Sequence, residues 1–214
     1  MKLIIFGATG DVGRNAVAEA LSRGHDVTAV ARNRERLAAL DSQITRVAVD
    51  IEAEPEQTDA LMQGQDAAIS ALRPATGQEA KLVPLTRAIL SAAAVTGVPV
   101  YVTGGAGPLR LADESGHTVL SAPGFLPDHV RPIAEACAAQ DRLLDDHPDA
   151  PWICLRPPAM LIDGMRTGRY ALARDTLVTD DDGNSSISYA DFAVALLDLA
   201  ELRPRPLARL TVGW

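Results

Sequence analysis

Three glycines spaced three residues apart, Gly7, Gly10 and Gly13, form the pattern in this sequence that most plainly predicts a chemical role. An apolar run precedes them and an amphipathic stretch follows, so the turn joins a predicted strand to a predicted helix. Gly7 permits the tight turn, Gly10 lets a ligand approach the backbone, and Gly13 lets the helix pack closely on the sheet. The free N–H groups and positive dipole end of the helix attract phosphate. We therefore expect a dinucleotide to contact Gly7, Thr9, Gly10, Asp11, Val12 and Gly13. The alternative is a glycine-rich turn that binds nothing.

Basic residues at the end of the second predicted strand indicate which dinucleotide this is. Arg32, Asn33 and Arg34 stand where an NAD site places an acid on the ribose 2′-hydroxyl, and an arginine there suits the 2′-phosphate of NADP instead. We therefore expect NADP(H) as the cofactor, the alternative being arginines that only solvate a loop. Asp50 and Ile51, after the third strand, would flank the adenine, although an acid there is also common as a cap.

Short apolar runs alternate with helical patterns through the first half of the chain, which predicts a Rossmann-type, doubly wound parallel sheet. The predicted strands cover residues 3–6, 27–31, 46–49, 67–70, 98–102, 152–155 and 207–212. The predicted helices cover residues 12–23, 34–40, 57–62, 79–96 and 128–146, and a last helix follows Ser188, with Asp191 as a variant capping box. Residues 167–186 look like a hairpin with a turn at Asp182-Gly183.

The length predicts a single α/β domain over residues 1–214 with a small C-terminal appendage. Residues 104–130 and 157–190 would form its substrate side. A net charge of −8 argues against a nucleic-acid partner. The sequence has two cysteines, no long unbroken apolar segment and no spacing of histidines that would ligate a metal. We expect a cytoplasmic monomer or homodimer with no membrane partner and no metal.

Several motifs together resemble the atypical short-chain dehydrogenases/reductases, nearest to their NmrA-like NAD(P)H-binding subgroup with the flavin and biliverdin reductases. These motifs are the glycine turn, Ala31-Arg32-Asn33, Asp50, and residues 103–107, 155–159, 166–170 and 182–185. The resemblance implies that Ser70, Ala71, Leu72 and Arg73 pass along the cofactor. It further implies that Thr103, Gly104 and Gly105 lie near the nicotinamide ribose, and that Pro157 and Pro158 wall the nicotinamide pocket. Strand-end packing is the alternative explanation for all of them.

The Tyr-x-x-x-Lys proton-donor pair of better-known members of that superfamily is absent. Residues four positions after Tyr101, Tyr170 and Tyr189 are Gly105, Arg174 and Ala193. The remaining catalytic candidates are Thr103, as a hydrogen-bond donor, and His129, as an acid near neutral pH. Arg73 and Arg156 would either meet an anionic substrate or pair with nearby acids.

Without that pair, reduction of a conjugated small-molecule acceptor such as a flavin or quinone fits better than reduction of an isolated carbonyl, because the resulting charge is delocalised. The sequence therefore predicts an NADPH-dependent oxidoreductase. The alternative is a non-catalytic NADP(H)-binding redox sensor. A nucleotide-sugar or isomerase-type enzyme that uses bound NAD fits less well, because Arg32 favours NADP and the C-terminal half is short.

Overall fold

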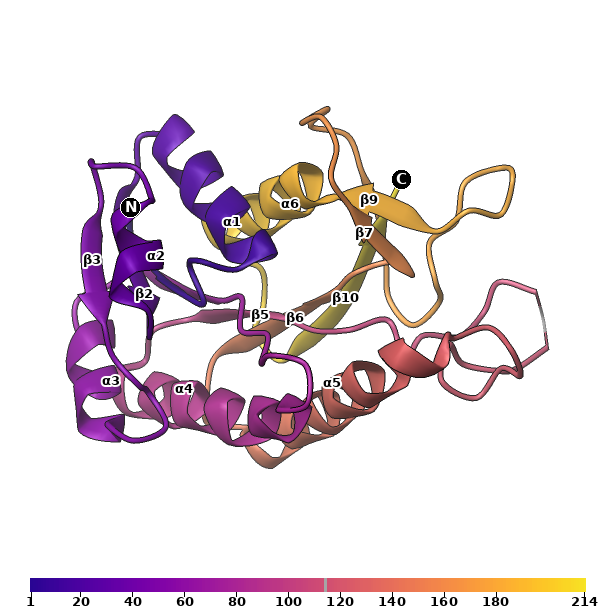
Figure 1. Ribbon diagram of the computed structural model, residues 1–214, viewed down its shortest axis with the longest axis horizontal. Coiled ribbons are helices and arrows are strands. Elements are labelled where there is room, and N and C mark those ends of the chain that lie inside the picture. Colours follow the sequence, from indigo (N-terminus) through magenta and orange to yellow (C-terminus); the bar gives the residue numbers. More distant parts are fainter. Residues whose placement is uncertain (114) are drawn as a thin grey trace.

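The computed structural model describes residues 1–113 and 115–214, and its centre is one eight-stranded sheet with the order β3-β2-β1-β4-β5-β6-β10-β8 (Figure 1). All pairings in this sheet are parallel except that of β8 with β10. A second, two-stranded sheet pairs β7 with β9 in parallel. The predicted Rossmann-type sheet is confirmed. The strands are β1 (Lys2–Phe6), β2 (Asp26–Ala31), β3 (Thr45–Ala48), β4 (Ala67–Ser70), β5 (Val100–Thr103), β6 (Trp152–Arg156), β7 (Met160–Ile162), β8 (Ala171–Ala173), β9 (Ser186–Ser188) and β10 (Ala208–Gly213).

Helices cover both faces of the sheet. Figure 1 shows α1 and α6 on one face and α3, α4 and α5 on the other, and α1 packs against α6 while α4 packs against both α3 and α5. The α-helices are α1 (Asp11–Ser22), α2 (Arg34–Ala38), α3 (Pro55–Met62), α4 (Leu82–Thr96), α5 (Arg131–Leu143) and α6 (Tyr189–Leu202). Short 3-10 turns cover η1 (Glu79–Lys81), η2 (Asp128–Val130) and η3 (Leu144–Asp146).

Alternation along β1 divides the core into two layers. Leu3 and Ile5 face α1 and α6, whereas Ile4 and Phe6 face the opposite helix layer, and all four side chains are 0% exposed. This two-sided burial explains why β1 reads as a continuous apolar run rather than as an alternating one. Helix α1 buries Gly13, Ala16, Val17 and Ala20, which are spaced to lie on one face of a helix. The helical pattern seen in the sequence is therefore the face that packs on the sheet.

The predicted hairpin over residues 167–186 is wrong. Strand β8 pairs antiparallel with β10, at the edge of the main sheet, and β9 pairs with β7. The turn itself is present, because Gly183 N–H donates to Asp180 O at 3.0 Å and Gly183 has φ of +81°. Local turn chemistry was therefore predicted correctly, but both flanking strands find partners far away in the sequence.

Two buried carboxylates hold the segment between β7 and β8 on the α1–α6 layer. Asp191, 0% exposed, accepts hydrogen bonds from Thr167 N and Gly168 N at 2.8 Å and from the Trp214 indole at 3.0 Å. Ser188 Oγ accepts from Asp191 N, so the predicted N-cap is present. The Asp191 carboxylate binds Thr167 and Gly168 instead of returning a hydrogen bond to Ser188 N as in a capping box.

Glu19 is the second of these carboxylates. Its side chain accepts both the Nε and an NH2 hydrogen bond of Arg166, at 2.7 and 2.8 Å, and also binds Arg23. The hydrogen bonds from Arg166 hold the pKa of Glu19 below its usual value.

In the described part of the chain, no helix is long and apolar enough to cross a membrane.

Candidate functional site

The glycine turn lies at the carboxyl end of β1, where the strand order reverses between β2 and β4. Gly7 has φ of +75°, and a Cβ there would lie 2.5 Å from Ala71 O. A Cβ on Gly13 would overlap the Gly7 carbonyl and lie 2.8 Å from Ala8 Cα. The fold itself therefore requires glycine at both positions, and the crevice at this switch point is where open α/β sheets bind ligands.

Gly10 differs from its two neighbours in the motif. Its φ is −81°, and the nearest protein atom to a Cβ would be Gly7 O at 3.3 Å. It is the N-cap residue of α1, and no side chain caps this helix. The first N–H groups of a helix have no partner within it, so those of Asp11, Val12 and Gly13 need an outside acceptor. Uncapped N–H groups that follow a residue without a side chain fit a phosphate-bearing cofactor.

Arginines follow β2, the strand beside β1. Arg32 and Arg34 are exposed, and their predicted role at a 2′-phosphate stays a prediction. Asn33 has a structural role, because its side-chain oxygen accepts from Arg36 N at 2.8 Å and caps α2. Arg36, which sequence analysis missed, donates from its guanidinium to Thr9 O at 3.0 Å. The sequence signal that could have revealed Arg36 is the N-cap Asn33, because the capped residue is Arg36, the third residue of α2.

The residues after β3 form a local turn. Asp50 Oδ1 accepts from Glu52 N at 3.1 Å, and Asp50 O accepts from the N–H groups of Ala53 and Glu54. Ile51 is 4% exposed and packs in the core layer of α3 and α4. Asp50 therefore serves the backbone here, and its predicted position beside the adenine stays a prediction.

Two hydroxyls at the ends of β4 and β5 are buried with no hydrogen-bond partner in the described residues. They are Ser70 Oγ and Thr103 Oγ1. Ser70 pairs with Val102 across the two strands, so Thr103 lies one residue further along the same edge. Buried polar groups are normally hydrogen-bonded, and an unpaired one calls for an explanation such as a ligand. Both hydroxyls belong to segments that we expected to pass along the cofactor, of which Ala71 is buried and Arg73 exposed.

The glycines after β5 are explained by close packing on two thiols. A Cβ on Gly104 would lie 2.7 Å from Cys154 Sγ, and one on Gly105 would lie 2.5 Å from Cys137 Cβ. Burial raises the pKa of Cys137 to about 11 and that of Cys154 to about 12, so both are neutral thiols. Neither is a nucleophile near neutral pH.

The residues at the end of β6 contact the segments predicted to form the substrate side, residues 104–130 and 157–190. Arg156 is 3% exposed and donates to Arg174 O and to Asp175 Oδ1, at 2.5 and 3.0 Å, so it pairs within the protein. Pro157 and Pro158 are buried. Ala159 packs against the cluster of Leu109, Val119 and Leu177, which ties residues 104–130 to residues 157–190.

The structure does not bring the two catalytic candidates together. His129 is exposed in η2, whereas the residue of α5 that lies against Gly105 is Cys137. Eight residues separate them, or about 12 Å at the rise of a helix. Thr103 ends β5 at the carboxyl edge of the sheet, whereas His129 lies in η2, toward the end of residues 104–130.

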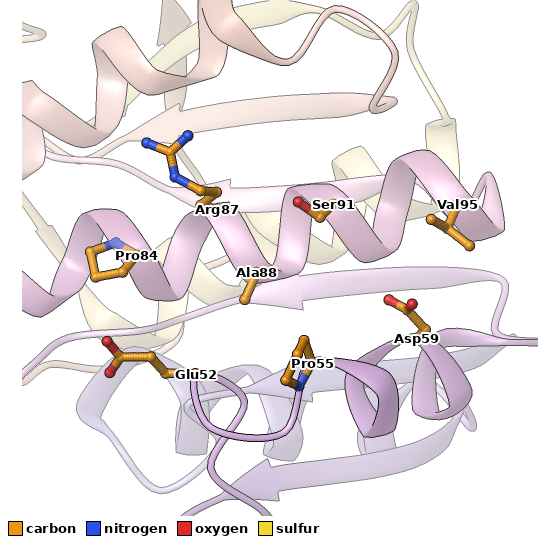
Figure 2. A pocket seen from close by; sticks show the side chains of 8 residues that line it. All are labelled: Glu52, Pro55, Asp59, Pro84, Arg87, Ala88, Ser91 and Val95. Atoms are coloured by element: carbon orange, nitrogen blue, oxygen red, sulfur yellow. The ribbon is translucent and has the colours of Figure 1, made fainter.

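Two hollows lie outside this crevice. A groove of about 310 Å³ separates α3 from α4, where Figure 2 shows Pro55 and Ala88 facing each other between the helices. A wider hollow of about 480 Å³ is lined by Thr167, Arg169 and Trp214. Neither contains a residue of the glycine turn, so neither competes with it as the cofactor site.

Comparisons with known proteins agree with this site. The family model described as NAD(P)H-binding matches residues 7–201. Similar solved structures that cover 100% of this chain include a candidate exported protein from Burkholderia pseudomallei, which is 33% identical with a TM-score of 0.87 and is itself covered to 100%. A candidate NADH-flavin reductase from Streptococcus pneumoniae is 30% identical with a TM-score of 0.88, and 99% of it is covered. A candidate epimerase from Bacteroides thetaiotaomicron is 30% identical with a TM-score of 0.88, and 96% of it is covered. They share the fold of this chain, while the descriptions that they carry differ.

Proposed function

Because this chain belongs to the NAD(P)H-binding family, within the atypical short-chain dehydrogenases/reductases, we propose that it is an NADPH-dependent reductase of a conjugated small-molecule acceptor such as a flavin or quinone. The observation that carries the proposal is the set of uncapped N–H groups that follow Gly10 at the start of α1, and two unpaired buried hydroxyls at the ends of β4 and β5 support it. The bound nicotinamide would supply the hydride. The candidate NADH-flavin reductase among the similar structures favours a flavin as acceptor.

The residues of this chain would bind and orient the cofactor. The first N–H groups of α1 would hold the pyrophosphate, and Ser70 Oγ and Thr103 Oγ1 would find acceptors on the nicotinamide half. Pro157 and Pro158 wall the pocket and exclude water. Fixing the reacting ring in this way is the main contribution that a protein makes to cofactor chemistry.

The preference for NADPH over NADH rests on the arginines around the turn. None of Arg32, Arg34 and Arg36 forms an ion pair with a carboxylate elsewhere in the described residues. Guanidinium groups match the geometry of phosphate, so they suit the 2′-phosphate that distinguishes NADP from NAD.

The acceptor class follows from the residues near the nicotinamide side. Thr103 can donate a hydrogen bond, but it cannot protonate a strongly basic alkoxide near neutral pH, and both thiols are neutral with raised pKa values. A conjugated acceptor spreads the charge, so a solvent proton suffices. We further propose a cytoplasmic monomer or homodimer, which suits free cysteines, with no membrane or nucleic-acid partner.

The test is NADPH oxidation by the purified protein with FMN, riboflavin, a benzoquinone and a simple ketone, each repeated with NADH. We expect turnover with a flavin or quinone, faster with NADPH, and none with the ketone. Tight NADPH binding without turnover on any acceptor would contradict the reductase proposal and favour the alternative, a redox sensor. The distance of His129 from the crevice is the observation that favours this alternative.

A further inference from the structure

Tyr189 lies at the nucleotide crevice although it belongs to no Tyr-x-x-x-Lys pair. It is the first residue of α6 and directly follows β9, in which Ser188 pairs with Ile162 of β7. Asp163 and Tyr189 therefore leave two adjoining strands at the same level. Since the two strands run in parallel, both residues emerge at the same end of the small sheet.

The first turn of α1 lies beside this end of the small sheet. Arg14 NH2 lies 3.9 Å from Asp163 Oδ1, and Arg14 NH1 lies 2.7 Å from Asp11 Oδ1. These contacts bring the end of β7, and with it Tyr189, to the uncapped N-terminus of α1. After burial, the charges of Asp11, Arg73, Asp163 and Arg14 contribute to the pKa shift of the Tyr189 phenol. Arg73 follows β4, which pairs with β1, so it leaves the sheet at the same carboxyl edge as the glycine turn.

The phenol has hydrogen-bonding capacity left over. Burial is the main reason that the pKa of Tyr189 is raised, and no hydrogen bond to the hydroxyl contributes to it. The hydroxyl is therefore protonated near neutral pH and can donate to an anion. Tyr170 shows the contrast, because its hydroxyl already donates to Asp198 Oδ2 at 2.5 Å.

We propose that Tyr189 donates its phenolic hydrogen to the cofactor pyrophosphate, from the side opposite the N–H groups of α1, with Arg73 as the neighbouring cation. This inference rests on the proposed function, since it needs a dinucleotide at the glycine turn. It gives α6 and the β7–β9 sheet a part in holding the cofactor, in addition to the β1–α1 turn.

The experiment compares two ligands on three proteins. NADPH carries the pyrophosphate, whereas adenosine 2′-monophosphate carries the adenine and the 2′-phosphate without it. The wild type, Tyr189→Phe and the matched control Tyr170→Phe are titrated with both ligands by calorimetry or competition. We expect Tyr189→Phe to weaken NADPH about tenfold, the effect of one hydrogen bond to a charged group, and to leave adenosine 2′-monophosphate within about twofold.

Tyr170→Phe should leave both affinities unchanged, because its hydroxyl is used by Asp198. Arg73→Gln, at an exposed position, is the second variant and should also weaken NADPH alone. Wild-type affinity of Tyr189→Phe for NADPH would overturn the inference, as would an equal loss for both ligands. Failure of the wild type to bind NADPH would instead overturn the proposed function, so the two failures are distinct.

Discussion

Replacing Gly10 by alanine separates what the ligand requires from what the fold requires. Gly10 has an ordinary φ of −81°, and a Cβ would lie 3.3 Å from Gly7 O and 3.9 Å from Ala71 O. The protein should therefore fold, losing about 0.5 to 1 kcal/mol because alanine is a poorer N-cap than glycine. The added methyl would project toward the pyrophosphate, and overpacking of about 1 to 3 kcal/mol raises the dissociation constant about 5- to 150-fold.

The assay measures thermal unfolding without ligand and NADPH affinity for the same set of variants. Gly13→Ala should lose both stability and binding, because its Cβ would overlap the Gly7 carbonyl. Gly24→Ala is the matched control: its φ of +75° costs about 1 to 2 kcal/mol of stability, but nothing lies near it and NADPH affinity should not change. Wild-type affinity in Gly10→Ala, or unfolding as severe as in Gly13→Ala, would refute this division of roles.

Three further predictions follow from named contacts. Arg32→Ala and Arg36→Ala should each weaken NADPH about tenfold or more and leave NADH nearly unchanged, and equal loss for both cofactors in titration would remove the 2′-phosphate assignment. Glu19→Gln should cost about 2 to 3 kcal/mol in denaturant unfolding at pH 7, because Glu19 is 5% exposed while its partner Arg166 is half exposed. Since the folded-state pKa of Glu19 is lowered, this stabilisation is complete above its usual value of 4.5 and is lost as the pH falls through the folded-state pKa, so wild type and variant should converge in acid. Cys137, with a pKa of about 11, should react with iodoacetamide at pH 8 on the order of a hundred times more slowly than a free cysteine, and a free-thiol rate in the folded protein would contradict its burial.

The glycine turn could be predicted from sequence because its determinants are local. Gly7 turns the chain out of β1 and Gly13 packs against that same turn, a few residues away. The apolar run of β1 and the helical spacing of α1 are likewise written in adjacent residues, and together they predicted the sheet and its crevice.

The other parts of the site depend on contacts between distant segments. Arg36 reaches Thr9 only because Asn33 caps α2 and β2 lies beside β1. The proposed role of Tyr189 depends on the pairing of β9 with β7, a strand too short to be recognised by alternation. The hairpin prediction failed for the same reason, since β10 and β7 supply the partners for β8 and β9.

The most direct test of the central claim is a single-turnover reaction of this protein with NADPH deuterated at the transferred position of the nicotinamide and with FMN in the absence of oxygen. The account predicts oxidation of NADPH coupled to bleaching of the flavin, a slower rate with deuterium, and loss of the reaction in Gly10→Ala. Tight binding of NADPH with no oxidation by FMN or by any quinone would contradict it.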